Sequence, residues 1–305
     1  SISKSDLCSD LVGEYPELQG VMGKYFALAQ GFEEDVANSV SDHYLPTGLT
    51  SVLPKKPFSY SISIVDKIDT LVGFFIINEK PTSSKDPFAL RRAAIGLLRI
   101  IIENKLSFKL RDLISYAIRL YQEQGVEIKN EKTEQQVLEF IKERMRNVLK
   151  LKNIKTDVIE ASISSHAGDN FLALYAKTLL MNKYKNKGIG LNAINSYKRA
   201  SNILDKAGKR ITGRPDAVLF RKDEEKILHE KINEIRKAFT VKDDKKDYES
   251  LLIKLSDVKE STDNFFDNVV VNDENQDIKN NRLELLKMFC NTFDNFIDFS
   301  KLEGL

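Results

Sequence analysis

Two stretches of the sequence place cationic side chains where they could bind an anion. In the first, a Pro-Thr-Ser-Ser-Lys loop at residues 81–85 leads into a helix with Arg91 and Arg92 side by side. Asp86 is a good N-cap residue, and Pro87 suits the first helical position because the N–H that it lacks has no partner there. We therefore predict an ordinary helix start at Asp86. This helix start does not explain the two arginines, which could bind a phosphate, a partner surface or an acid within the domain.

The second stretch is a predicted helix at residues 191–210, LNAINSYKRASNILDKAGKR. Its apolar residues can face a core, and its polar residues fall on the other side at three- and four-residue spacings. These polar residues are Asn195, Lys198, Arg199, Asn202 and Lys206, followed by Lys209 and Arg210 at the helix end. Such a face suits contact with a polyanion, and it is equally typical of a solvated helix surface.

The charge distribution along the chain also allows two interpretations. The whole chain has a net charge of only +2. Residues 186–242, however, contain 14 Lys and Arg against 7 Asp and Glu, whereas residues 243–305 contain 8 against 15. A basic block followed by an acidic one indicates either a surface that faces a polyanion or two helical segments that attract each other.

Few residues suit nucleophilic or metal chemistry. His43, His166 and His229 are the only histidines, and none has a second histidine four residues on, which excludes a two-histidine metal site on one helix. Cys8 and Cys290 lie far apart, so we expect free, buried thiols of a cytosolic protein. The sequence contains neither a nucleophile-elbow motif nor a glycine-rich phosphate loop with a lysine. The sequence does not exclude a Ser-His-Asp arrangement that the fold assembles from distant residues.

The elements that position these residues are predicted to be helices. Of the 305 residues, 42% are hydrophobic, 30% are charged and only 7 are proline, and the apolar periodicity is mostly helical. The longest apolar run, Leu71–Ile77, is far too short to span a bilayer. No secretory leader opens the chain, and it begins at Ser1 with a pattern typical of a helix interior, so we expect part of a longer protein.

Aromatic residues near the C-terminus could stack on nucleic-acid bases or fill a core. They are Phe265, Phe266, Phe289, Phe293 and Phe296. The last three recur at i, i+4 and i+7, the spacing of one buried helix face. We therefore predict that these rings belong to the core.

Several stretches resemble the β subunit of the bacterial two-subunit glycyl-tRNA synthetases. The longest are GEYPELQGVMG at residues 13–23 and KPTSSKDPFALRRA at residues 80–93. YKRASNIL at residues 197–204 and FFDNVVVNDENQDIKNNRLELL at residues 265–286 follow in the same order. The resemblance extends over nearly the whole chain and places it as the C-terminal part of that subunit.

The resemblance implies an all-α protein in three parts. These are an HD-like helical domain at residues 1–125, a helical connecting region at 126–185, and an anticodon-binding helical bundle at 186–305 similar to the one that ends arginyl-tRNA synthetases. It also implies a cytoplasmic enzyme that joins glycine to glycine tRNA with ATP and Mg²⁺, as an α2β2 assembly whose α subunit holds the active site. The β subunit mainly holds the tRNA, so neither a catalytic residue nor a cofactor nor a membrane contact is expected here.

The basic segment coincides with the RNA-binding region that the resemblance implies, so its cations and amides become candidates for tRNA contact. The tRNA-binding residues would be Lys198, Arg199, Asn202, Lys206, Arg210 and Arg282, and Lys85, Arg91 and Arg92 would contact tRNA or the partner subunit. Arg282 stands near the start of the last helix, where the macrodipole makes a cation slightly unfavourable. Either a ligand phosphate or a nearby acid would compensate.

An HD-type hydrolase would bind a metal through two histidines, a His-Asp pair and a distal aspartate. The positions that come nearest are Asp6, His43 and Asp66, but Ser5 stands before Asp6 where a histidine is needed. One imidazole and two carboxylates make a poor transition-metal set, so we predict a degenerate site without metal. The alternatives to tRNA binding are an HD-type metal-dependent phosphohydrolase and a helical protein–protein scaffold.

Overall fold

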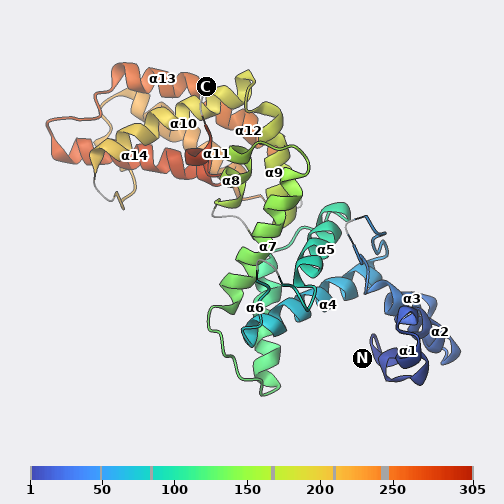
Figure 1. Ribbon diagram of the computed structural model, residues 1–305. Coiled ribbons are helices and arrows are strands. Elements are labelled where there is room, and N and C mark those ends of the chain that lie inside the picture. The colour runs from blue at the N-terminus through green and yellow to red at the C-terminus, as the bar shows by residue number, and fades with distance from the viewer. Residues whose placement is uncertain are drawn as a thin grey trace. The chain divides into compact units, whose positions relative to one another are not determined.

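A computed structural model describes residues 2–48, 50–82, 85–165, 169–208, 211–241 and 247–303, and within these ranges every regular element is a helix (Figure 1). The predicted all-α class is confirmed. The chain divides into two compact units, residues 1–148 and 149–305, and the boundary lies inside the predicted connecting region. The assignment of residues 1–125 to an HD-like domain stays a prediction. No helix in the described ranges is long and apolar enough to cross a membrane.

Unit 1 is built around α4, whose buried face includes Ile68, Leu71 and Phe75. The helix α2 packs on α3, α3 packs on α4, and α4 packs on both α5 and α6. The helices of this unit are α1 (Asp10–Glu14), α2 (Val21–Ala29), α3 (Glu34–Asp42), α4 (Pro57–Ile76), α5 (Leu90–Glu103), α6 (Leu110–Glu123) and α7 (Thr133–Lys150), which extends two residues past the boundary.

The start of α5 differs from the prediction. Asp86 is not the N-cap residue, because a turn at residues 87–88 follows it and α5 begins only at Leu90, after Ala89 in a left-handed conformation. The Asp86 carboxylate nevertheless accepts hydrogen bonds from the backbone N–H groups of Leu90 and Arg91, at 2.9 and 3.1 Å. It therefore still satisfies the first donors of the helix, from a position outside it.

A buried lysine joins α4 to the segment that follows α3. Lys67 is 5% exposed, and its Nζ donates to the carbonyl oxygen of Leu45 at 2.8 Å, to Ser63 Oγ at 2.8 Å and to the carbonyl oxygen of His43 at 3.3 Å. Burial lowers the pKa of Lys67 to about 8. The ammonium thus fixes a non-helical segment at the cost of its own solvation.

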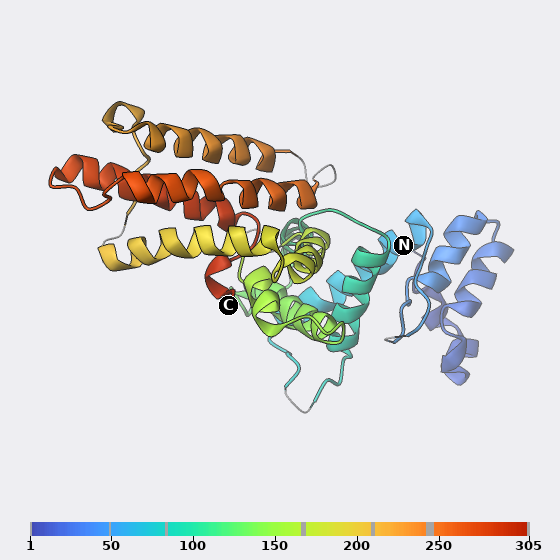
Figure 2. The ribbon, with the colours of Figure 1, turned by 90° about the horizontal axis from the view of Figure 1, so that it is seen from above.

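Unit 2 is a bundle in which α10 packs against α12 and α14, while α11 packs against α13 and α14. Figure 2 shows α10, in yellow, running alongside the orange and red helices of the same unit. It ends at Gly208, whose φ of +60° favours glycine as the residue that stops the helix. The helices of this unit are α8 (Thr156–Ile163), α9 (Phe171–Tyr184), α10 (Gly188–Ala207), α11 (Asp223–Phe239), α12 (Tyr248–Asp257), α13 (Lys259–Asn268) and α14 (Gln276–Asp294).

The predicted aromatic core is confirmed for four of its five rings. Phe265, Phe289, Phe293 and Phe296 are at most 1% exposed. Phe266 is not buried, which corrects the prediction. Consecutive residues of a helix point in directions about 100° apart, so one of two adjacent phenylalanines faces outward.

The two cysteines also differ from each other. Cys290 lies on the core face of α14 and is 3% exposed, as predicted. Cys8 is exposed, because the short helical turn Ser5–Cys8 buries only its second residue. The expectation of a buried thiol at Cys8 was wrong.

Candidate nucleic-acid interface

Unit 2 contains a pocket of about 640 Å³ beside the C-terminal half of α10. Its walls come from α10, the end of α13, the segment 269–272 and the first turns of α14. Its described lining residues are Arg199, Ile203, Lys206, Ala207, Phe266, Val269, Val270, Val271, Asn272, Lys279 and Leu283. Three of them are cations and none is an acid, so the pocket combines an apolar interior with positive charge.

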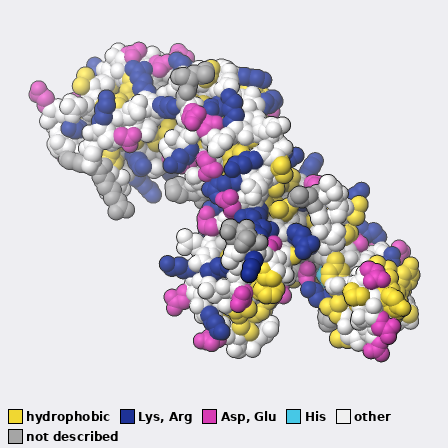
Figure 3. All heavy atoms as spheres, in the orientation of Figure 1, with side chains coloured by type: hydrophobic (Ala, Val, Ile, Leu, Met, Phe, Trp, Pro, Cys, Tyr) yellow, Lys and Arg dark blue, Asp and Glu magenta, His cyan; other side chains and the backbone are white. Residues whose placement is uncertain are grey.

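The structure brings two of the predicted α10 residues to this pocket. Arg199 and Lys206 are exposed and line it, whereas Asn202 is exposed and Lys198 half-buried, and neither is among its lining residues. Arg210 lies outside the described residues. Figure 3 shows that lysine and arginine side chains, in dark blue, are spread over unit 2 among acidic ones. The candidate site is therefore identified by the pocket that its residues line and not by a dense basic patch.

Arg199 reaches the pocket already paired. Its Nη1 donates to Oδ1 of Asp263 at 3.2 Å and its Nη2 to Oδ1 of Asp267 at 3.1 Å, both on α13. Its Cζ lies 4.6 Å from the centre of the Phe266 ring. Lys206 and Lys279 differ from it, because they make no ion pair within the part of the chain that the structure describes.

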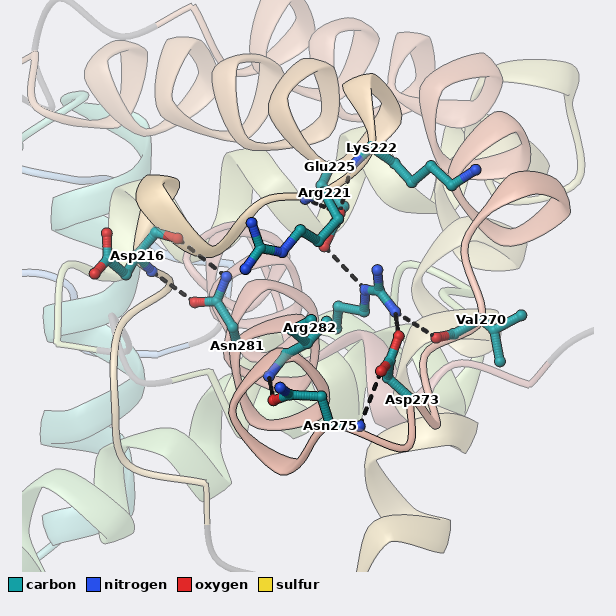
Figure 4. A network of polar contacts seen from close by, with 10 residues as sticks. Asp216, Arg221, Lys222, Glu225, Val270, Asp273, Asn275, Asn281 and Arg282 are labelled. Atoms are coloured by element: carbon teal, nitrogen blue, oxygen red, sulfur yellow. Dashed lines mark hydrogen bonds and ion pairs between the residues drawn. The ribbon is translucent and has the colours of Figure 1, made fainter.

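Arg282 lies in a buried network rather than on the surface (Figure 4). Its side chain is 5% exposed, and its Nε donates to Oε1 of the fully buried Glu225 at 3.0 Å. Its Nη1 donates to Oδ2 of Asp273 at 2.7 Å and to the carbonyl oxygen of Val270 at 2.8 Å. We predicted that either a ligand phosphate or a nearby acid would compensate this cation, and the structure shows nearby acids. Because Nε and Nη1 already donate within the protein and the side chain is 5% exposed, we leave Arg282 out of the interface proposed below, and its contact with tRNA stays a prediction.

The same network holds the segments that flank α11 and α14. Glu225 Oε2 accepts the backbone N–H groups of Arg221 and Lys222, both at 2.8 Å. Asn281 exchanges two hydrogen bonds with the backbone of Asp216, at 2.7 and 3.0 Å. The backbone N–H of Asn275 and then the Arg282 guanidinium lower the pKa of Asp273. Figure 4 shows these groups converging from three segments, one of which carries Val270 of the pocket wall.

Lys279 and Phe266 are site residues that the sequence did not reveal. Lys279 stands in the acidic block, where the charge count gave no reason to look for a binding cation. Phe266 was assigned to the core with its neighbour. The only available signal was helical position, since Lys279 and Arg282 are three residues apart and share a side of α14.

The predicted contacts of unit 1 lie at the start of α5. Lys85 and Arg92 are exposed, whereas Arg91 is half-buried and donates to the carbonyl oxygen of Thr82. Arg144 of α7 lies with its guanidinium 4.9 Å from the centre of the Phe140 ring, and burial, followed by the charge of Arg91, lowers its pKa. The role of Lys85, Arg91 and Arg92 in binding tRNA or a subunit stays a prediction.

The three degenerate HD positions have protein partners. Asp6 is buried and its Oδ2 accepts the backbone N–H of Gly20 at 2.6 Å, while Asp66 pairs with Lys4 at 2.5 Å. His43 is fully buried, its Nδ1 donates to the carbonyl oxygen of Val40 at 2.8 Å, and burial lowers its pKa. No group of three or more His, Cys, Asp or Glu residues in the described ranges is placed to hold a metal ion. We therefore derive no metal-dependent step from this region.

Two family models match the chain. Residues 1–164 match the model described as glycyl-tRNA synthetase beta subunit. Residues 193–303 match the DALR anticodon binding domain, a range that contains α10 from its sixth residue onward and every described lining residue of the pocket.

Curated relatives match over almost the full chain. The glycine–tRNA ligase beta subunits of Rickettsia canadensis (strain McKiel) and Rickettsia africae (strain ESF-5) are each 39% identical over 301 residues, which cover 99% of this chain. The corresponding protein of Rickettsia prowazekii (strain Madrid E) is 38% identical over the same length. The matched residues make up 44%, 43% and 43% of these three proteins, so the chain spans less than half of their length.

Proposed function

Since the chain belongs to the glycyl-tRNA synthetase β subunit family, we propose that it binds glycine tRNA through unit 2. The observation that carries the proposal is the pocket beside α10, which has three cations and no acid among its described lining residues. Cations suit phosphates, and an apolar interior suits unpaired bases. The pocket lies within the range that matches an anticodon-binding domain.

The remaining parts of the proposal concern the whole enzyme. The β subunit holds the tRNA while the α subunit joins glycine to it with ATP and Mg²⁺, in an α2β2 assembly in the cytoplasm. This chain contributes position rather than chemistry. Holding the tRNA in a productive orientation converts an encounter of separate molecules into a step within one complex, which is worth several orders of magnitude in rate. No observation on the described residues favours the phosphohydrolase or the scaffold.

A salt series on the affinity for glycine tRNA tests the proposal. The variant combines Lys206→Ala and Lys279→Ala, which removes the two pocket lysines that make no ion pair with a described residue. Each lysine that contacts a phosphate releases about one counterion, so the slope of log K against log salt should fall by about one to two units. The matched control is Lys226→Ala, an exposed lysine of α11 that pairs with Asp223 and does not line the pocket.

Three outcomes separate the possibilities. A reduced slope in the pocket variant, with an unchanged slope in the control, supports the proposal. Equal slopes in all three proteins would place the phosphate contacts elsewhere and contradict it. A wild-type chain that does not bind glycine tRNA even at low salt would overturn tRNA binding by this chain.

A further inference from the structure

Three side chains of α13 hold the Arg199 guanidinium in one plane. Asp263 and Asp267 accept hydrogen bonds from its two terminal nitrogens, and the Phe266 ring lies against it. Guanidinium donors point outward in the plane of the group, whereas its flat faces stack on aromatic rings. Two of the five in-plane N–H donors are therefore occupied, and the Phe266 ring covers one side of the group. The uncovered side and the remaining donors are what Arg199 can still offer to the pocket that it lines.

The charge around Arg199 makes it a poor phosphate ligand. Lys259 also pairs with Asp263, so two cations and two carboxylates alternate along this part of the surface. A phosphate that approached Arg199 would meet the repulsion of Asp263 and Asp267 at close range. Lys206 and Lys279, without an ion pair in the described ranges, have no such acids to compete with.

Part of the pocket wall is apolar, and its backbone is held by a hydrogen bond. Val269, Val270 and Val271 form it, and Arg282 holds the carbonyl oxygen of Val270 at 2.8 Å. The pocket thus presents a planar cation, an apolar wall and two separate lysines. Unpaired bases in RNA are bound by stacking on aromatic rings or guanidinium planes, with cations at the flanking phosphates.

We infer that the pocket takes one unpaired nucleobase, stacked on the free face of the Arg199 guanidinium, while Lys206 and Lys279 bind the phosphates on either side of it. The inference rests on the tRNA binding proposed above and adds the class of group that enters the pocket. It changes the role predicted for Arg199 from a phosphate contact to a stacking plane. Asp263, Asp267 and Phe266 act as positioning residues for that plane.

Arg199→Lys in the full chain tests the inference, because it keeps the positive charge and removes the plane. Loss of one stacked base should lower the affinity for glycine tRNA by about tenfold. The slope of log K against log salt should stay that of the wild type, whereas Lys206→Ala should lower the slope by about one. Circular dichroism confirms that each variant is folded.

A series of glycine tRNAs, each with one abasic nucleotide in a single-stranded loop, identifies the base. At the position that enters the pocket, removal of the base should lower wild-type affinity by about tenfold and should cost Arg199→Lys nothing further. At other positions the effects of the two changes should multiply. Such coupling at one position is the signature of a stacked pair.

Two results would overturn the inference while leaving tRNA binding intact. One is a salt slope that falls by about one in Arg199→Ala, which removes the charge as well as the plane, since this would make Arg199 a phosphate contact after all. The other is a wild-type affinity for glycine tRNA that Arg199→Lys does not change, with no coupled loop position. If the wild-type chain does not bind glycine tRNA at all, the inference and the proposed function fail together.

Discussion

Lys67 in unit 1 and Arg282 in unit 2 are both buried cations that tie a non-helical segment to a helix, and they are paired in different ways. In unit 1, the Lys67 ammonium donates to two backbone carbonyl oxygens and one hydroxyl. In unit 2, the Arg282 guanidinium donates to two carboxylates and one carbonyl oxygen. The first cation is hydrogen-bonded but not neutralised, whereas the second is balanced by acids. Equal burial therefore has different consequences.

The difference shows which part of the molecule responds to pH. Burial lowers the pKa of Lys67 to about 8, below its ordinary value of 10.5, because no carboxylate hydrogen-bonds to it. The charge of Arg282 is compensated by its carboxylate partners. Removal of one partner would leave that charge buried without compensation and would destabilise the fold. The stability of unit 1 should thus change with pH in the alkaline range, whereas the stability of unit 2 should fall when a partner of Arg282 is substituted.

The largest expected effect is that of Glu225→Gln on unit 2. It removes the fully buried carboxylate and leaves Arg282 under-compensated, so the free energy of unfolding should fall by about 3 kcal/mol or more. Labelling of the buried Cys290 thiol in urea, in a Cys8→Ser background, reports the opening of unit 2. Glu224→Gln is the matched control, because Glu224 precedes Glu225 on α11 and is only half-buried. Equal labelling of the two variants would contradict a structural role for the network.

The second effect is the pH dependence of unit 1. Between pH 8 and 10.5 the unfolded chain keeps the Lys67 proton that the folded chain has lost, so the free energy of unfolding should rise with pH in that interval. The gain should approach roughly 3 kcal/mol at the upper end. Lys67→Met lacks the titrating group. The free energy of unfolding of the wild type minus that of this variant, followed by hydrogen exchange of α4, should therefore stay constant below pH 8 and rise above it. A signed difference that falls or stays constant above pH 8 would show that the ammonium is not destabilised by burial.

The smallest effect concerns the start of α5 in unit 1. Asp86→Ala removes the carboxylate that accepts the N–H groups of Leu90 and Arg91, and should cost about 1 kcal/mol. Asp86→Asn keeps an acceptor oxygen and should retain most of that stability. Faster hydrogen exchange in the first turn of α5, seen for alanine but not for asparagine, is the expected result. Equal exchange in both variants would contradict capping from outside the helix.

The helical class and the C-terminal core could be predicted from the sequence because spacing reports which residues share a helix face. Phe289, Phe293 and Phe296 are buried together for this reason. Spacing does not report what covers a face. Arg282 seemed available to a phosphate until the structure placed Glu225, 57 residues earlier in the chain, against it. Lys279 and Phe266 were missed for the same reason, since the segment 269–272 that completes their pocket folds back in a way no local pattern encodes.

Arg282 holds the pocket wall by a main-chain oxygen, so the shape of that wall does not depend on the side chain at position 270. Val270 is 72% exposed, and its hydrogen bond to Arg282 would survive most replacements. A substitution at position 270 can therefore change the chemistry of the pocket surface while the backbone of the pocket wall keeps its shape. If the pocket takes a base as inferred above, a polar residue at position 270 would change which base is preferred without rebuilding the bundle. Related proteins could then differ in selectivity while they keep one architecture.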